Sequence, residues 1–125
     1  DVEPATDRIW HWIDANLPSG APLIVIGFSQ GGLMATQLLR TRPERIKATV
    51  ILAGFTLNGQ QPSDAWLSEN KPKVIYCRGL NDQVISPDAV VRTEAWLNRC
   101  TAPVIKTYPG LGHSIDERVM EEVVD

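Results

Sequence analysis

The sequence predicts an α/β fold in which parallel strands form one sheet and helices cover both of its faces. Apolar segments of strand length alternate along the chain with segments of helical periodicity. The strand segments are too apolar to leave one face in water, as in parallel sheets, and crossovers of this kind are right-handed. With 125 residues the chain is the size of one domain, and we assign residues 1–125 to it.

The first elements are expected to be a helix, a strand and a second helix. Apolar residues at four-residue spacing indicate a covering helix over residues 4–16, and Pro18-Ser19-Gly20 ends it. The run Leu23–Ile26 predicts a strand buried on both faces. A helix is expected over residues 30–42, because Pro43 cannot continue it.

The rest of the chain repeats the alternation. Ser86-Pro87 is a good cap and first turn for a helix that reaches about Arg99. Ser114-x-x-Glu117 has the pattern of a capping box that opens a last helix. The remaining strands are predicted over residues 46–55, 73–77 and 104–108.

A serine stands at a predicted strand-to-helix turn. The spacing Gly27-x-Ser29-x-Gly31 is typical of a nucleophile elbow, where the serine has a strained backbone and larger neighbours would collide. Such a turn exposes the hydroxyl of Ser29. It also points the backbone N–H of Gln30, at a helix start, toward the place where an oxyanion would form. Ser29 is therefore the candidate nucleophile and Gln30 the candidate oxyanion donor.

Two further candidates follow the ends of other predicted strands. Ligands bind at the carboxyl ends of strands in open parallel sheets, and Asp82 and His113 fall there as Ser29 does. An imidazole can take the proton of a serine hydroxyl and return it to the leaving group, and a carboxylate can orient the imidazole. The chain order serine, acid, histidine is that of the α/β-hydrolases. We expect Ser29, His113 and Asp82 to form a catalytic triad.

Asp82 also has another interpretation, and other aspartates of the chain could supply the acid of the triad. Asn81-Asp82 can also be read as a simple turn-forming pair. Asp64 lies in a connection expected to be irregular, whereas Asp88 and Asp116 are typical helix-start residues.

A substrate pocket is expected beside the connection 56–71, which has no clean period and is long for a compact domain. Phe55, Leu57 and Trp66 are the candidate walls of an apolar acyl or alcohol pocket. The alternative is that these side chains only seal the core beneath the loop.

Composition argues against several other classes of partner. A net charge of −3 without a basic run gives no reason to expect nucleic acid. No apolar stretch is long enough to cross a bilayer and no signal-peptide pattern is present, so a cytoplasmic location is the default expectation. Cys77 and Cys100 lack metal-like spacing and are expected to be reduced thiols.

Three motifs together resemble the phospholipase/carboxylesterase family of α/β-hydrolases, which includes acyl-protein thioesterases. They are Gly-Phe-Ser-Gln-Gly-Gly at residues 27–32, Gly79-x-x-Asp82, and Gly-x-Gly-His-Ser at residues 110–114. The resemblance implies hydrolysis of carboxylic esters, lysophospholipids or acyl thioesters through an acyl-enzyme. It implies Ser29 as nucleophile, His113 as base and Asp82 as orienting acid, with neither a metal nor an organic cofactor.

The chain also departs from that family. Members carry further strands ahead of the elbow and a His-Gly loop that donates the second oxyanion N–H, and this chain has no counterpart of either. The strand at residues 23–27 would then lie at an edge of the sheet. We expect the chain to be the C-terminal part of such a hydrolase, with that edge covered by the N-terminal part or by another copy in a homo-oligomer. Alternatives are an impaired fragment that serves as a pairing module, and a peptidase of the same fold.

Overall fold

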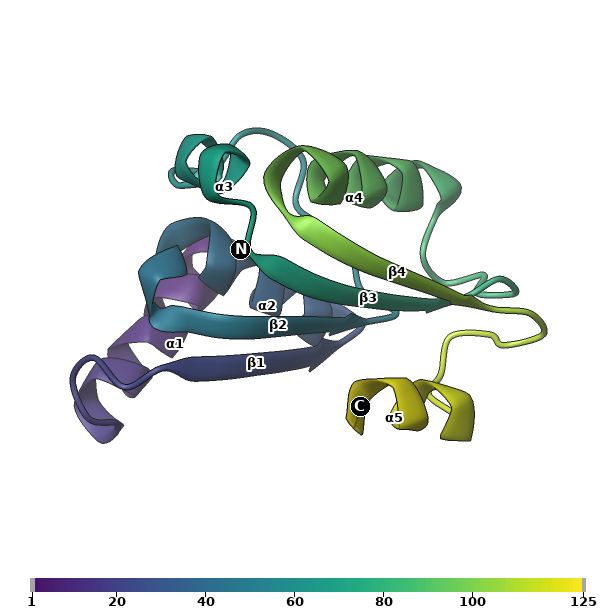
Figure 1. The fold of residues 1–125 in the computed structure, drawn as a ribbon, viewed down its shortest axis with the longest axis horizontal. Helices are drawn as coiled ribbons and strands as arrows, with labels where there is room; N and C mark the ends of the chain where they lie inside the picture. Colours follow the sequence, from purple (N-terminus) through teal and green to yellow (C-terminus); the bar gives the residue numbers. More distant parts are fainter. Residues whose placement is uncertain (1, 125) are drawn as a thin grey trace.

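The computed structural model describes residues 2–124 and places the strands in one parallel sheet. The four strands lie in the order of the chain, so each strand pairs in parallel with the next. Figure 1 shows the twisted sheet with the carboxyl ends of its strands gathered at one rim. The strands are β1 (Leu23–Phe28), β2 (Ile46–Leu52), β3 (Lys73–Gly79) and β4 (Ala102–Tyr108).

Helices cover both faces of the sheet, as the alternating pattern predicts. The helices α1 to α4 lie on one side, and α5 lies on the other side near the carboxyl ends of the strands (Figure 1). The α/β fold class inferred from the sequence is confirmed. The helices are α1 (Val2–Asn16), α2 (Gln30–Thr41), α3 (Asp64–Asn70), α4 (Pro87–Cys100) and α5 (Glu117–Val124), with a short 3₁₀ turn η1 (Pro43–Arg45) before β2.

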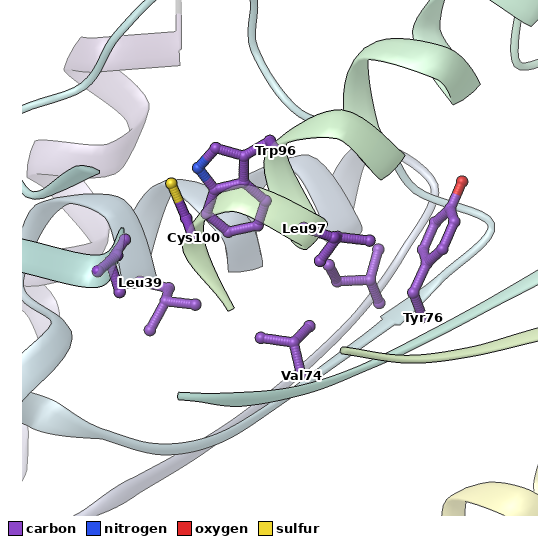
Figure 2. Close-up of a cluster of buried hydrophobic side chains, with 8 residues drawn as sticks. Leu39, Val74, Tyr76, Trp96, Leu97 and Cys100 are labelled. Carbon is purple, nitrogen blue, oxygen red and sulfur yellow. The ribbon is translucent and has the colours of Figure 1, made fainter. Parts of the chain in front are cut away.

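The strands supply side chains to two cores because successive residues point to opposite faces. On the side of α2, α3 and α4, Val74 and Tyr76 of β3 pack with Trp96 and Leu97, all of them almost completely buried (Figure 2). Burying an apolar side chain of this size stabilises the fold by about 1.5–3 kcal/mol. A second cluster on the α5 side contains the following residues: Val50, Leu52, Cys77, Tyr108, Leu111 and Val119.

The two cysteines are buried, unpaired and in different clusters. Cys100 belongs to the cluster beneath α4, whereas Cys77 belongs to the cluster beneath α5. They are free thiols in this structure, in agreement with the prediction from their spacing.

Two local predictions are wrong. The connection 56–71 is not wholly irregular, because it contains α3, whose first residue Asp64 forms a buried ion pair with Arg40. A tertiary contact fixes this short helix, and a contact of that kind leaves no periodic pattern. Ser114 does not cap the last helix: α5 begins at Glu117, and Asp116 accepts the N–H of Val119 at 3.2 Å.

Other helix starts agree with their sequence signals. Ser86 accepts the backbone N–H of Ala89 at 3.1 Å, as expected for the cap of α4. The helix α2 begins directly after Ser29, so the serine lies at a strand-to-helix turn.

The elbow strand lies at an edge of the sheet, as predicted. β1 pairs with β2 alone among the described residues. The expectation that this strand is buried on both faces is wrong: its side chains that face away from α1 are solvent-exposed, with 64% of Ile24, 54% of Ile26 and 40% of Phe28 accessible. An apolar strip with unpaired backbone groups therefore borders the site described next.

Candidate active site

Ser29 occupies a strained turn between β1 and α2. Its φ of 57° lies in the left-handed region that residues with a side chain rarely adopt. Gly27 is required for this turn, because a Cβ there would lie 2.0 Å from the carbonyl oxygen of Gly31. The expectation that Gly31 also avoids a collision is wrong, since a Cβ on Gly31 would meet no atom within 4 Å.

The three sequence-predicted polar residues form one hydrogen-bonded line. His113 Nε2 lies 2.8 Å from Ser29 Oγ, and His113 Nδ1 lies 2.8 Å from Asp82 Oδ2. The Asp82 carboxylate can only accept a hydrogen bond, so Nδ1 of His113 carries the hydrogen and donates it to Asp82, which leaves Nε2 to accept from the serine hydroxyl. This is the arrangement in which an imidazole can remove the proton of a serine.

Asp82 is held as an anion by its surroundings. Burial raises the pKa of this carboxyl, but the hydrogen bond with His113 and the backbone N–H groups of Ile85 and Val84 outweigh that effect, so its pKa lies below the usual value. The two N–H groups donate to Oδ1 at 3.1 and 2.9 Å, which leaves Oδ2 to the imidazole. The side chain of Asp82 is 7% exposed and that of His113 is 17% exposed, so the carboxylate is the more enclosed partner.

The close approach of the acid loop and the histidine loop depends on Gly79, which the sequence indicated only as part of the motif Gly79-x-x-Asp82. A Cβ on Gly79, the last residue of β3, would lie 2.1 Å from the carbonyl oxygen of Leu111. The loops are also joined by the bond from Asn81 N–H to the Leu111 carbonyl at 2.9 Å. A Cβ on Gly112, within the histidine loop itself, would meet no such crowding. The signal available in the sequence was a glycine directly at the end of the strand.

The ring of Phe28 also contacts the imidazole of His113, a contact that the sequence did not indicate. Its ring centroid lies 5.0 Å from that of His113, with an interplanar angle of 38°. The contact places an aromatic wall on one side of the base and restricts the motion of the ring.

A pocket of about 450 Å³ opens beside Ser29. Of the three predicted pocket residues, Phe55 lines it, Leu57 lines a separate hollow of about 640 Å³, and Trp66 is exposed on α3. Sequence reasoning missed the opposite wall, because the residues before and in the first turns of α4 read only as a helix start. The pocket residues are Ser29, Gln30, Phe55, Val84, Ile85, Ser86, Ala89 and Arg92.

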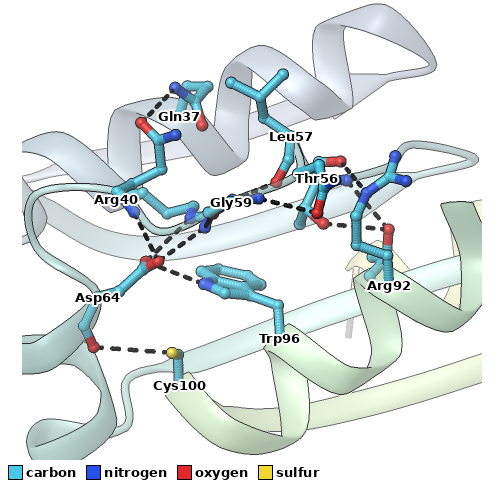
Figure 3. Close-up of polar contacts among 12 residues, drawn as sticks. Gln37, Arg40, Thr56, Leu57, Gly59, Asp64, Arg92, Trp96 and Cys100 are labelled. Atoms are coloured by element: carbon cyan, nitrogen blue, oxygen red, sulfur yellow. Dashed lines mark hydrogen bonds and ion pairs between the residues drawn. The ribbon is translucent and has the colours of Figure 1, made fainter.

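The competing aspartates lie elsewhere. Asp64 pairs with Arg40 and accepts the indole N–H of Trp96, in the buried network of Figure 3. Asp116 pairs with Arg118 on the surface, and Asp88 is exposed in the first turn of α4. Of these four carboxylates only Asp82 contacts the histidine.

Gln30 is the first residue of α2, and the first N–H groups of a helix have no partner within it. The N–H groups of Gly32 and Leu33 donate to the Ser29 carbonyl at 2.9 and 3.2 Å, whereas the N–H of Gln30 makes no hydrogen bond within residues 2–124 and is available to an anion held beside Ser29.

Two further searches concern other kinds of site. Within residues 2–124 no helix combines the length and hydrophobicity that a membrane span requires. In the same part of the chain, no three His, Cys, Asp or Glu side chains are grouped so that they could hold a metal ion.

Comparison with known sequences places the chain in a family. Residues 3–125 match the model of the family described as Phospholipase/Carboxylesterase. A rice protein (Oryza sativa subsp. japonica) named "Probable carboxylesterase" is 27% identical over 121 residues, which cover 93% of this chain and 46% of that protein. The chain thus spans about half the length of this curated relative.

Solved structures share the fold. A single-residue variant of Arabidopsis thaliana SOBER1 superimposes with a TM-score of 0.74 at 21% identity, over 98% of this chain and 60% of that one. A carboxylesterase of Bacillus cereus gives a TM-score of 0.74 at 17% identity, over 98% and 56% of the two chains. The α/β-hydrolase type of fold expected from the motifs is therefore confirmed.

Proposed function

Because the chain belongs to the phospholipase/carboxylesterase family, we propose that it is a serine hydrolase of carboxylic esters in which Ser29, His113 and Asp82 form the catalytic triad. The observation that carries the proposal is the line of two 2.8 Å contacts that joins hydroxyl, imidazole and carboxylate. The proposed substrates are small esters or thioesters, including lysophospholipids.

The proposed reaction has two acyl-transfer steps. Ser29 Oγ attacks the ester carbonyl carbon while His113 Nε2 takes the hydroxyl proton, and the carbonyl electron pair moves onto oxygen. Collapse of this intermediate breaks the bond to the alcohol, which leaves with the proton from His113. Water then attacks the acyl-enzyme with His113 again as base, and the acid and free Ser29 are released. Asp82 keeps the imidazole oriented and stabilises its charged form.

The N–H of Gln30 is the proposed donor to the oxyanion. Removal of one such donor typically slows hydrolases by about 10²- to 10³-fold, so a second donor is part of the proposal. The edge of β1 lies beside the site and pairs with no further strand among the residues that the structure describes. We propose that further polypeptide, from a segment ahead of this chain or from a second copy, covers this edge and supplies the second N–H.

A fluorophosphonate probe tests the nucleophile directly, because it reacts with activated serines. We expect labelling at Ser29, found by peptide mass spectrometry, and turnover of 4-nitrophenyl butyrate. Ser29→Ala is expected to abolish both, whereas Ser63→Ala, a change in a serine outside the site, is the matched control. Hydrolysis that survives in Ser29→Ala, or labelling of another serine, contradicts the proposal.

A second candidate function is favoured by the exposed edge of β1. The strip of Ile24, Ile26 and Phe28, together with the unpaired backbone, suits a module that associates through this strand without catalysis. Absence of labelling at Ser29, combined with stable self-association or association with other chains in size-exclusion chromatography, favours the pairing module over the hydrolase.

A cytoplasmic location remains part of the proposal. It is supported by the free thiols of Cys77 and Cys100, which suit a reducing compartment.

A further inference from the structure

The pocket beside Ser29 has one charged wall. Arg92, on the second turn of α4, lines it together with the apolar side chains of Phe55, Val84 and Ile85. Arg92 is half-buried, and a guanidinium in partly apolar surroundings is stabilised by an anionic partner.

Arg92 is anchored at one nitrogen and free at the others. Its Nε donates to the carbonyl of Thr56 at 3.0 Å, an interaction drawn in Figure 3. No bond from its two terminal nitrogens to another residue occurs within residues 2–124, nor does any carboxylate of that part of the chain lie within ion-pair distance of them. The anchor fixes the direction of the guanidinium while leaving most of its donors available.

The carboxylates on neighbouring elements do not supply the missing partner. Glu94 on the same helix pairs with Arg78 at 3.4 Å, and Asp64 of α3 is committed to Arg40. Asp88, one turn before Arg92 on α4, is exposed and forms no ion pair with it. The positive charge at this wall is thus uncompensated by the groups that face it.

Arg92 also stands at a boundary between two environments. It lines the apolar pocket beside Ser29 and the larger hollow of about 640 Å³, which has polar walls such as Asn58 and Gln60. The pocket therefore places the Ser29 hydroxyl, several apolar side chains and one guanidinium in the walls of a single cavity.

We propose that the portion of the substrate held in this pocket is apolar next to the ester and carries an anionic group, a carboxylate or phosphate, that binds Arg92. The inference rests on the proposed function and adds a substrate class to it. A guanidinium is suited to this task because its planar fork can donate two parallel hydrogen bonds to such a group. The net charge of −3 opposes a general attraction of anions, so a preference for anionic esters must come from a local cation.

Matched ester pairs test the proposal in the unmodified protein. Mono-4-nitrophenyl esters of dicarboxylic acids are compared with 4-nitrophenyl esters of monocarboxylic acids of equal chain length, which places the charge on the acyl side. 4-Acetoxybenzoate is compared with 4-acetoxytoluene to place the charge on the leaving side, and 4-acetoxyphenyl phosphate tests phosphate. We expect the anionic esters of one series to have a kcat/KM about tenfold or more above that of their neutral counterparts, as one charge-assisted hydrogen bond allows. The preference should fall as salt is added.

Variants connect the preference to Arg92. Arg92→Leu is expected to remove the anionic-to-neutral ratio of kcat/KM, mainly through a higher KM for the anionic ester. Arg92→Lys is expected to keep part of the ratio, because it restores charge without the fork. Arg99→Leu is the control for general electrostatics: Arg99 is exposed on the same helix and does not line the pocket beside Ser29, so the ratio should stay as in the unmodified protein.

The two levels of proposal fail differently. If Ser29 is not labelled and neutral esters are not turned over, the hydrolase function itself is wrong. If neutral esters are hydrolysed and no anionic series is preferred, or if Arg92→Leu keeps the preference, the role of Arg92 is wrong while the hydrolase stands. Since the first comparison uses the unmodified protein, a poorly folded Arg92→Leu variant does not prevent the test.

Discussion

Two aspartates of this chain have similar environments and different uses. Asp64 and Asp82 are both enclosed, and each is hydrogen-bonded to a cationic or titratable side chain and to backbone N–H groups. For both, burial raises the pKa of the carboxyl, but the hydrogen bonds together lower the pKa by more, so that it lies below the usual value. They differ in the partner, which is Arg40 for Asp64 and His113 for Asp82.

The partner decides what the carboxylate can do. A guanidinium is only a hydrogen-bond donor, and that of Arg40 holds other segments in place: it donates to both oxygens of Asp64 and to the carbonyls of Leu57 and Gly59 (Figure 3). This network holds the loop between β2 and α3 in place. An imidazole can both accept and donate a proton, and that of His113 faces the hydroxyl of Ser29. Burial and a low pKa alone therefore do not identify a catalytic acid.

The largest effect is expected from Asp82→Asn. The amide keeps the shape of the side chain but can favour the wrong tautomer of His113, so kcat for 4-nitrophenyl butyrate should fall by about 10⁴-fold. Urea unfolding should show a smaller loss of stability than for Asp64→Ala, because the amide oxygen can still accept the N–H groups of Val84 and Ile85 and no buried guanidinium loses its partner. A small rate loss would mean that Asp82 is not the orienting acid.

Asp64→Ala is expected to lower the stability of the fold more than Asp82→Asn does. Removal of one partner leaves the Arg40 charge buried and unpaired, which typically costs about 3–5 kcal/mol in the free energy of unfolding. The measurement is urea denaturation at neutral pH, with Asp88→Ala as the control for an exposed aspartate. A stability loss below that of the control would show that the network does not hold the loop.

The sequence was sufficient to predict the fold class and the line of Ser29, His113 and Asp82, because both leave local signals. Apolar strand segments recur between helices, and each polar residue directly follows a strand in a glycine-containing turn. Asp64 was misjudged as part of an irregular loop, since its partner Arg40 lies 24 residues earlier and no local pattern connects them. The packing role of Gly79 and the place of Arg92 in the pocket were not predicted for the same reason: both arise from contacts between segments that meet only in the folded chain.

A smaller effect is expected from Trp96→Phe, which isolates one bond to Asp64. The indole N–H donates to Oδ1 at 3.1 Å, and a phenyl ring retains most of the apolar contact without the donor. Loss of a hydrogen bond to a charged group is expected to cost about 1.5–3 kcal/mol of unfolding free energy. A double-mutant cycle with Asp64→Asn checks the assignment, and additive losses would contradict a direct interaction of the two side chains.

The smallest effect is expected from the pH dependence of stability, through the protonation of Asp64 in acid. The pKa of Asp64 is below its ordinary value of 3.8 in the folded protein, so the unfolded chain takes up the proton first as the pH falls. The stabilisation by Asp64 is therefore complete above pH 3.8 and is lost as the pH falls from there through the folded pKa.

Urea unfolding of the unmodified protein and of Asp64→Asn over this range is expected to give two stability curves that converge toward acid. Asp82→Asn serves as the matched comparison, because the pKa of Asp82 is lowered in the same direction and its curve should converge in the same sense. Curves that stay parallel for Asp64→Asn would show that the ion pair with Arg40 does not hold this carboxyl in its charged form.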